Sequence, residues 1–150
     1  MSAIIKLKHL KKRFDDHWVT RGVGLDVPEG KMTVIVGRSG EGKSVLLKQI
    51  VGLIKPTSGT IIVEGTDITQ LTEKQLQEYY KKVGYVFQFA ALLDSLTVFE
   101  NVGITLLERG EKKAEVLPIV QEKLSQVLLG EDTLDKYPSE LSGGMRKRVG

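Results

Sequence analysis

The chain has 150 residues, the size of one ordinary domain, and carries a net charge of +3 at pH 7. Its residues are 41% hydrophobic and 27% charged, which is typical of a globular protein and excludes a disordered or fibrous one. The absence of cysteine excludes disulfides and cysteine-based zinc sites. The sequence contains neither an apolar run of the ~20 residues that a membrane span needs nor a signal peptide, so we expect a cytosolic protein.

Basic residues cluster near the start, between Lys6 and Arg13, and again at Arg146–Arg148. Such clusters can mark nucleic-acid or membrane contacts. No aromatic residues alternate with them to form a base-stacking surface, and we therefore interpret both clusters as solvated faces. The sequence predicts no nucleic-acid partner.

The first half of the chain predicts strands separated by one helix. The apolar run at 32–36 (MTVIV) is typical of a strand buried on both faces in the middle of a parallel sheet. The residues after it have helical spacing as far as a stop at Pro56. The predicted strands are 3–10, 17–27, 32–36 and 59–64, and the predicted helix is 43–54.

The second half predicts mainly helices. Thr72 and Gln75 can form a capping box at the start of a helix near 73–81, and the next strand is expected at 83–87. Helices follow at 97–109 and 114–129, and another begins near Ser142. The second of these is expected to be kinked or started by Pro118, with an apolar stripe of Leu117, Val120, Leu124, Val127 and Leu128.

The segment from Gly37 to Ser44 fits the pattern G-x-x-x-x-G-K-[ST] between an apolar strand and an amphipathic helix. Glycines permit a tight loop whose backbone N–H groups face an anion, and the helix N-terminus adds its positive dipole end. Lys43 would reach the β- and γ-phosphates, and the Ser44 hydroxyl would hold Mg²⁺. The sequence predicts Mg-ATP binding by Gly37, Arg38, Ser39, Gly40, Glu41, Gly42, Lys43, Ser44 and Val45.

Two further segments distinguish among the many proteins with such a loop. Ser142 is an N-cap residue followed by Gly143 and Gly144, a helix start that a phosphate can approach closely. Gln88 ends the expected strand 83–87, and the apolar residues 90–93 after it are typical of a partner surface.

Together these segments resemble the ABC ATPases over all 150 residues. Leu141-Ser142-Gly143-Gly144-Met145 resembles their signature motif, and Gln88 their Q-loop glutamine. The resemblance implies an α/β P-loop NTPase fold with an N-terminal antiparallel β subdomain and a helical subdomain. It also implies that Lys43 and Gln88 act in catalysis, with Gln88 touching Mg²⁺ and the attacking water. Ser142, Gly143 and Gly144 would contact ATP held by a second ATPase subunit in a head-to-tail dimer.

The resemblance also implies a transmembrane permease partner, gripped by the region Gln88–Val98, and a location at the inner face of the cell membrane. FQFAALLDSLTVFENV and PSELSGGMRKRVG look most like the Mla-type, MCE-associated phospholipid transporters, which implies a phospholipid substrate. Phe14 falls where the family places an adenine-stacking ring. Trp18 is a rival for that role, and core packing is the alternative for Phe14.

The resemblance covers the N-terminal part of one ABC ATPase domain, about 1–90 for the β subdomain with the phosphate loop and about 91–150 for the helical subdomain. The family's core strands beyond that point, including the Walker B strand and its catalytic glutamate, are missing. We therefore expect unpaired strands at 34–36 and 83–86, marginal stability and no turnover. The alternatives are a truncated nucleotide-binding fragment and a soluble P-loop ATPase that serves no transporter.

Overall fold

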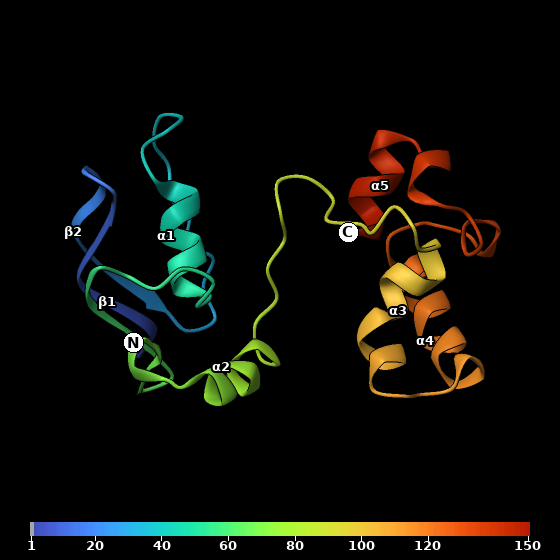
Figure 1. Cartoon of the computed structure of the whole chain (residues 1–150), viewed down its shortest axis with the longest axis horizontal. Coiled ribbons are helices and arrows are strands. Elements are labelled where there is room, and N and C mark those ends of the chain that lie inside the picture. The colour runs from blue at the N-terminus through green and yellow to red at the C-terminus, as the bar shows by residue number, and fades with distance from the viewer. Residues whose placement is uncertain (1) are drawn as a thin grey trace. The chain divides into compact units, whose positions relative to one another are not determined.

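The computed structural model describes residues 2–150, which form two compact units, one ending at Tyr85 and the other beginning at Val86 (Figure 1). Each unit has its own buried hydrophobic cluster. The first contains an antiparallel sheet with a helix beside it, and the second is helical.

The sheet of the first unit has four strands in the order β2-β1-β3-β4, and every neighbouring pair is antiparallel. The strands predicted at 3–10, 17–27 and 59–64 are confirmed. β1 is longer than predicted because the hairpin of β1 and β2 continues to the turn at Asp15-Asp16, and β2 is longer by Pro28, which pairs with Ala3. The bounds are β1 Ala3–Phe14, β2 His17–Pro28, β3 Ser58–Val63 and β4 Thr66–Asp67.

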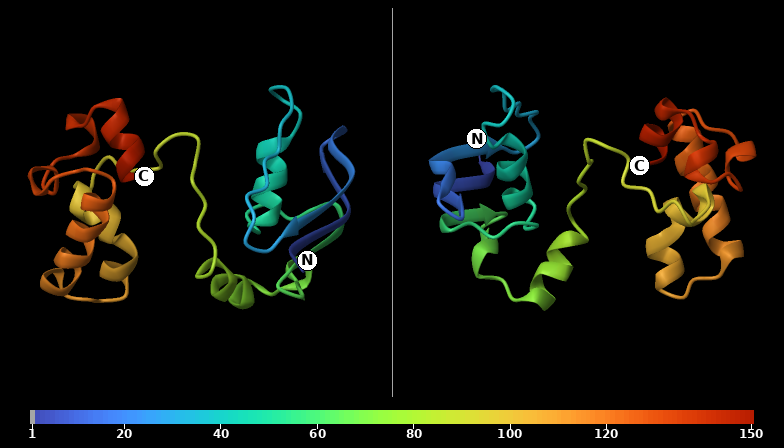
Figure 2. Two further views of the ribbon diagram at one scale, coloured as in Figure 1. Left: turned by 180° about the vertical axis from the view of Figure 1, so that it is seen from behind. Right: turned by 45° about the horizontal axis from the view of Figure 1, so that its top comes forward.

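Helix α1 (Lys43–Ile50) lies beside the sheet (Figure 2). It contributes Leu46 and Ile50 to a buried cluster with side chains of β1, β3 and the short 3₁₀ helix η1 (Ile68–Gln70). The helix ends four residues earlier than predicted. Its last carbonyls accept bonds from the chain as it turns away, from Gly52 N to the Gln49 oxygen and from Ile54 N to the Lys48 oxygen.

The predictions of strands at 32–36 and 83–87 are wrong. Neither segment is a strand in the structure, and Met32, Val34 and Val36 are 92%, 70% and 84% exposed. A strand obtains its ladder hydrogen bonds from a neighbour. Within residues 2–150 no strand pairs with either segment, so their apolar sequence alone does not produce a sheet.

Helix α2 (Glu73–Tyr80) begins at the predicted capping box, which is confirmed: Gln75 N donates to Thr72 Oγ1, and Thr72 N donates to Gln75 Oε1 at 2.9 Å. Two tyrosines at its end donate to carbonyls at the end of α1. Tyr79 Oη lies 2.9 Å from the Ile50 oxygen and Tyr80 Oη lies 3.1 Å from the Gly52 oxygen. Burial, followed by the charge of Glu64, raises the pKa of the Tyr79 phenol.

The second unit contains α3 (Val98–Glu108), α4 (Lys113–Gln126) and α5 (Gly143–Val149), with 3₁₀ turns η2 (Glu131–Thr133) and η3 (Pro138–Glu140) before α5. The predicted helices are confirmed, and Pro118 lies inside α4 rather than at its start. The core of the unit consists of Val98, Phe99, Val116, Val120, Leu124, Leu129 and Leu141.

The apolar stripe of α4 differs from the predicted one at two positions. Val116, Val120 and Leu124 are buried, whereas Leu117 is 38% and Leu128 is 85% exposed. The spacing of four residues is kept, and it starts at Val116, where Val116 and Val120 pack close to Gly103 of α3. No helix within residues 2–150 has the length and apolar character to cross a bilayer.

We expect Tyr79→Phe to lower the free energy of unfolding by about 1 kcal/mol, because it removes the hydrogen bond to the half-buried Ile50 carbonyl. Tyr80→Phe is the matched control and should cost less, because Tyr80 is 40% exposed and water replaces its bond. Urea denaturation followed by circular dichroism measures both. An equal or larger loss for Tyr80→Phe would contradict the assignment.

The Tyr79 contribution also has a defined pH dependence. Because the folded pKa is raised, the folded protein favours the neutral phenol. The contribution is fully present below the unfolded pKa of about 10 and is lost as the pH rises through the higher folded pKa. The stability difference between the wild type and Tyr79→Phe should therefore shrink above that pH.

Candidate functional site

The loop Gly37–Ser44 joins the irregular residues 32–36 to α1, and Gly42 lies where the end of the loop meets the sheet. Gly42 has a φ of 85°, and a Cβ added to it would lie 2.5 Å from Val19 Cγ1 and 3.2 Å from the Val19 carbonyl oxygen. A side chain is thus opposed both by the left-handed backbone and by β2. Glycine at this position lets the first turn of α1 lie directly against the strand.

The N-terminus of α1 presents backbone donors that the helix itself does not use. The first helical bond runs from Leu46 N to the Gly42 oxygen at 2.8 Å, so the N–H groups of Lys43, Ser44 and Val45 precede it. Within the described chain no side chain caps this end, and the first turn has no acidic residue. The positive end of the helix dipole is therefore open to an anion, as the sequence predicts.

The Lys43 ammonium folds back over the loop. Its Nζ donates to the Gly37 oxygen at 2.8 Å and to the Arg38 oxygen at 2.6 Å. An ammonium has three donors, so these two bonds orient Lys43 and leave the third for a phosphate oxygen. The Ser44 hydroxyl is exposed beside it, at the second residue of α1.

The Glu41 carboxylate closes the loop from within. Its Oε2 accepts a hydrogen bond from Arg38 N at 2.7 Å, and a Cβ added to Gly37 would lie 2.7 Å from the same oxygen. The predicted site included Glu41 as one position of a motif. The structure shows that its side chain pairs with the loop's own backbone.

Phe14 and Trp18, the two candidates for adenine stacking, lie at the tip of the hairpin between β1 and β2. Phe14 is 42% exposed, which contradicts the core-packing alternative for it. Each ring has a cation near one face, with Lys12 Nζ 4.8 Å from the Phe14 centroid and Arg13 Cζ 5.6 Å from the Trp18 centroid. Val19, which contacts Gly42, follows Trp18 directly, and Figure 1 shows the hairpin tip and the loop at the same end of the sheet. The geometry keeps both candidates for stacking.

The second unit holds the remaining predicted residues, Gln88 and Ser142–Gly144. Gln88 lies in an exposed bend rather than at a strand end, which corrects the predicted strand 83–87. The segment after it is held by the Asn101 amide of α3, whose Oδ1 accepts from Leu93 N at 2.7 Å and whose Nδ2 donates to the Leu93 oxygen at 3.1 Å. Phe89, 76% exposed, and Leu93, 50% exposed, give the segment the predicted apolar surface.

Ser142 caps α5 as predicted, and its Oγ accepts from Met145 N at 3.2 Å. Leu141, Met145 and Val149 pack toward the core at every fourth residue, which leaves residues 142–144 exposed. A Cβ added to Gly143 or Gly144 would meet no atom within 4 Å. The packing of the unit itself therefore does not require glycine there. The chain just after α5 lies close to the Gln88 segment, because a Cβ added to Gly150 would lie 3.1 Å from Ala90.

The comparisons with known proteins decide the family. The family model described as "ABC transporter" matches residues 20–150. The chain belongs to the ABC transporter family. Among curated relatives, it is 43% identical to a probable ribonucleotide transport ATP-binding protein of Mycobacterium leprae, over 100% of this chain and 43% of that protein. It is 46% identical to methionine import ATP-binding protein MetN 1 of Rhodopseudomonas palustris, over 85% of this chain and 34% of that protein.

Solved structures of ABC proteins have the same fold. The ATP-binding cassette MJ0796, solved as a dimer bound to ADP and Pi, superposes with a TM-score of 0.86 at 31% identity, over 97% of this chain and 66% of that chain. CbiO1 of Clostridium perfringens gives a TM-score of 0.81 at 27% identity, over 99% and 59%. The predicted fold class, an ABC-type P-loop NTPase, is confirmed. The chain spans less than half the length of the curated relatives it matches.

Gly42 and Gly40 provide a matched pair of substitutions. Both have a φ near +85°, yet a Cβ on Gly40 would meet nothing within 4 Å, whereas one on Gly42 would clash with Val19. We expect Gly40→Ala to cost about 1 kcal/mol of stability from backbone strain alone, and Gly42→Ala to cost roughly 3 kcal/mol. Thermal unfolding measures both, and equal losses would show that the Val19 contact does not fix the loop.

Proposed function

We propose that this chain binds the triphosphate of Mg-ATP at the loop Gly37–Ser44. One observation carries the proposal: the open first turn of α1 and the Lys43 ammonium present backbone and side-chain donors around one loop. A polyphosphate carries several charged oxygens close together. Among common metabolite anions it is the one that needs so many N–H donors together with a cation. Membership of the ABC transporter family supports ATP as the nucleotide.

We assign roles to the site residues within this proposal. Gly37 to Val45 surround the phosphates, Lys43 neutralises their charge, and Ser44 holds Mg²⁺ together with Gln88. Phe14 stacks on the adenine, with Trp18 as the rival residue. Ser142, Gly143 and Gly144 meet the nucleotide of a second subunit. This assignment is supported by the exposure of all three residues and by the open space around the two glycines.

For residues 1–150 we propose nucleotide binding rather than turnover. Hydrolysis needs a carboxylate or similar group to position and activate water. The acidic side chain of the loop, Glu41, is already engaged by Arg38 N. ATP hydrolysis coupled to transport is the activity that we propose for the whole protein, with Lys43 and Gln88 taking part.

The proposed partners are a second ATPase subunit and a transmembrane permease, with the protein at the inner face of the cell membrane. The dimeric MJ0796 structures support the first partner, and CbiO1, described as part of the transporter complex cbiONQ, supports the second. The permease would contact the region Gln88–Val98, whose exposed Phe89 and Leu93 offer an apolar surface.

We propose a phospholipid as the substrate, because two segments of the sequence resemble those of the Mla-type phospholipid transporters. The relatives carry other names, ribonucleotide transport for one and methionine import for another, and these names differ from each other. A reconstituted transporter offered labelled phospholipid, methionine and ribonucleotide in parallel distinguishes the three. Transport of either soluble compound without phospholipid movement would exclude the lipid assignment.

Lys43→Ala tests nucleotide binding directly. We expect the affinity for a fluorescent ATP analogue to fall by at least about tenfold, because the substitution removes a charge-assisted phosphate contact. Lys48→Ala, in the same helix and away from the loop, is the matched control and should bind like the wild type. Equal affinities for Lys43→Ala and the wild type, measured by fluorescence titration, would overturn the proposal.

A further inference from the structure

The outward face of the sheet in the first unit carries basic side chains that the proposed nucleotide site does not use. Side chains alternate between the two faces of a strand, and residues paired across neighbouring strands project on the same face. Leu7 of β1 is buried, so Lys6 and Lys8 project to the other side. Arg21 of β2 pairs with Lys11 of β1, and both are exposed. We call this surface the basic face, and its residues are Lys6, Lys8, Lys11 and Arg21.

A bulge in β1 keeps these cations on one face. Strict alternation after Lys8 would turn Leu10 outward and Lys11 inward. The pairing register instead shifts around His9, whose φ is 50°. Leu10 is therefore fully buried, and Lys11 projects outward. The extra residue thus adds a third lysine to the face that holds Lys6 and Lys8.

The cations of the basic face have no ion-pair partner among residues 2–150. A Cβ added to Gly22 would lie 3.8 Å from Lys11 Cε, so this side chain lies over β2 where the strand has none of its own. Two carboxylates are in register with the Lys6 end of the face. Asp26 pairs with Lys6, and Asp67, two strands away, accepts from Thr69 N and caps η1. The cations of the face therefore outnumber the carboxylates.

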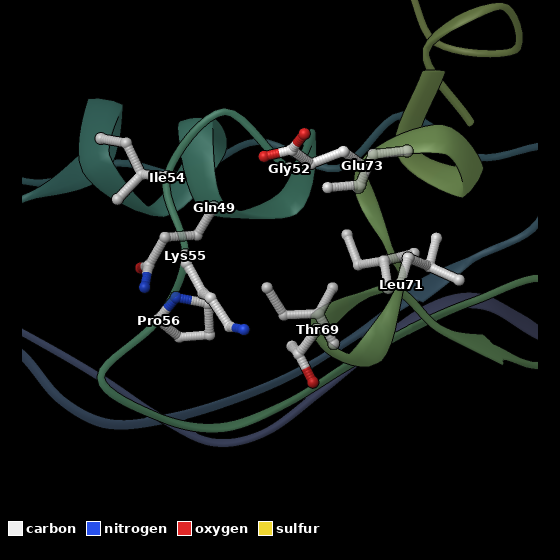
Figure 3. Close-up of a pocket in the computed structure, with 11 residues that line it drawn as sticks. Gln49, Gly52, Ile54, Lys55, Pro56, Thr69, Leu71 and Glu73 are labelled. Atoms are coloured by element: carbon white, nitrogen blue, oxygen red, sulfur yellow. The ribbon is translucent and has the colours of Figure 1, made fainter. Parts of the chain in front are cut away.

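The opposite face of the sheet is occupied by the fold itself. α1 lies against it and shares a buried cluster with Leu10 and Ile61 (Figure 2). Ile61 also lines a pocket of about 250 Å³, whose wall includes Ile54, Pro56 and Leu71 (Figure 3). Apolar side chains thus gather on one face of the sheet and cations on the other, which leaves the basic face available to a charged partner.

We propose that the basic face binds the anionic phospholipid headgroups of a membrane surface. A lysine presents a compact ammonium on a flexible stem, which suits phosphate groups that move within a bilayer. Outward positions two residues apart on a strand are about 7 Å apart, and neighbouring strands are about 5 Å apart, so the face meets several headgroups at once. This function goes beyond the solvated face that the sequence predicts. The lipid bound here belongs to the membrane surface and is not the transported molecule.

A nucleic acid is the other common polyanion, and the basic face lacks the groups that would read one. The residues of β3 in register with the three lysines are Ile62, Thr60 and Ser58. Bases therefore find no aromatic ring among these cations on which to stack. A bilayer needs only opposite charge on a broad surface, and this is what the face provides.

Cosedimentation with lipid vesicles tests the proposal on the purified chain. One set of vesicles is phosphatidylcholine alone, and the other contains one part phosphatidylglycerol to two parts phosphatidylcholine. Each Lys or Arg near an anionic membrane strengthens binding by about fivefold, so we expect at least about hundredfold tighter binding to the anionic vesicles. Raising the salt from about 0.1 M to about 1 M shortens the Debye length from about 10 Å to about 3 Å and should remove most of the difference.

Two double variants with the same net charge locate the contact. Lys8→Gln with Lys11→Gln removes two cations of the basic face and should weaken binding to anionic vesicles by about 25-fold. Lys74→Gln with Lys123→Gln removes exposed cations of α2 and α4 and should bind like the wild type. Lys8→Arg with Lys11→Arg keeps both charges and should also bind like the wild type.

ATP binding separates this inference from the proposed function. None of these lysines belongs to the loop Gly37–Ser44, so every variant should bind a fluorescent ATP analogue like the wild type, and Lys43→Ala should still bind anionic vesicles. The proposal is overturned if neutral and anionic vesicles bind equally or if the two glutamine double variants lose affinity equally. It is also overturned if a single-stranded oligonucleotide binds more tightly than anionic vesicles and loses its affinity in Lys8→Gln with Lys11→Gln.

Discussion

The contact between Gly42 and Val19 is the constraint on which the first unit depends. It places the first turn of α1 against β2, with no room for a Cβ between them. The same helix then buries Leu46 and Ile50 against β1 and β3, so the position of the loop and the packing of the core are set together. The end of the loop therefore lies against the sheet even though residues 32–36 do not form the expected strand.

The loop is organised by its own side chains as well as by glycine. Lys43 and Glu41 both bond to backbone atoms of the segment 37–38, one to carbonyl oxygens and the other to an N–H group. These bonds hold the loop through its own side chains, and such preorganisation lowers the entropy cost of ordering a loop around a ligand. In the second unit, the side chain of Asn101 holds the Gln88 segment, and the buried Leu141 holds the start of α5. The residues proposed to meet a partner stay exposed.

The features predicted correctly from the sequence are local ones. Capping at Thr72 and Ser142 involves residues three positions apart, and the loop motif is a continuous segment, so neighbouring residues suffice to define them. The segments 32–36 and 83–87 were predicted as strands from their apolar composition. A strand also depends on a distant partner, and no strand within residues 2–150 supplies one.

Other features could not be found because they depend on packing. The α4 stripe starts at Val116 rather than Leu117 because Val116 and Val120 fit around Gly103 of α3. The role of Asn101 depends on its hydrogen bonds to Leu93, eight residues earlier, and the full burial of Gln49 depends on how α1 packs in the first unit. Polar residues on helices are ordinarily exposed, so nothing in the residue pattern singles these two out.

The most direct test of the account is a ¹H–¹⁵N NMR titration of the chain with Mg-ATP and, separately, with adenosine. If the open first turn of α1 binds phosphate, Mg-ATP shifts the backbone amide signals of Lys43, Ser44 and Val45, and adenosine leaves them in place. Absence of these shifts with Mg-ATP, or equal shifts with adenosine, would contradict the account.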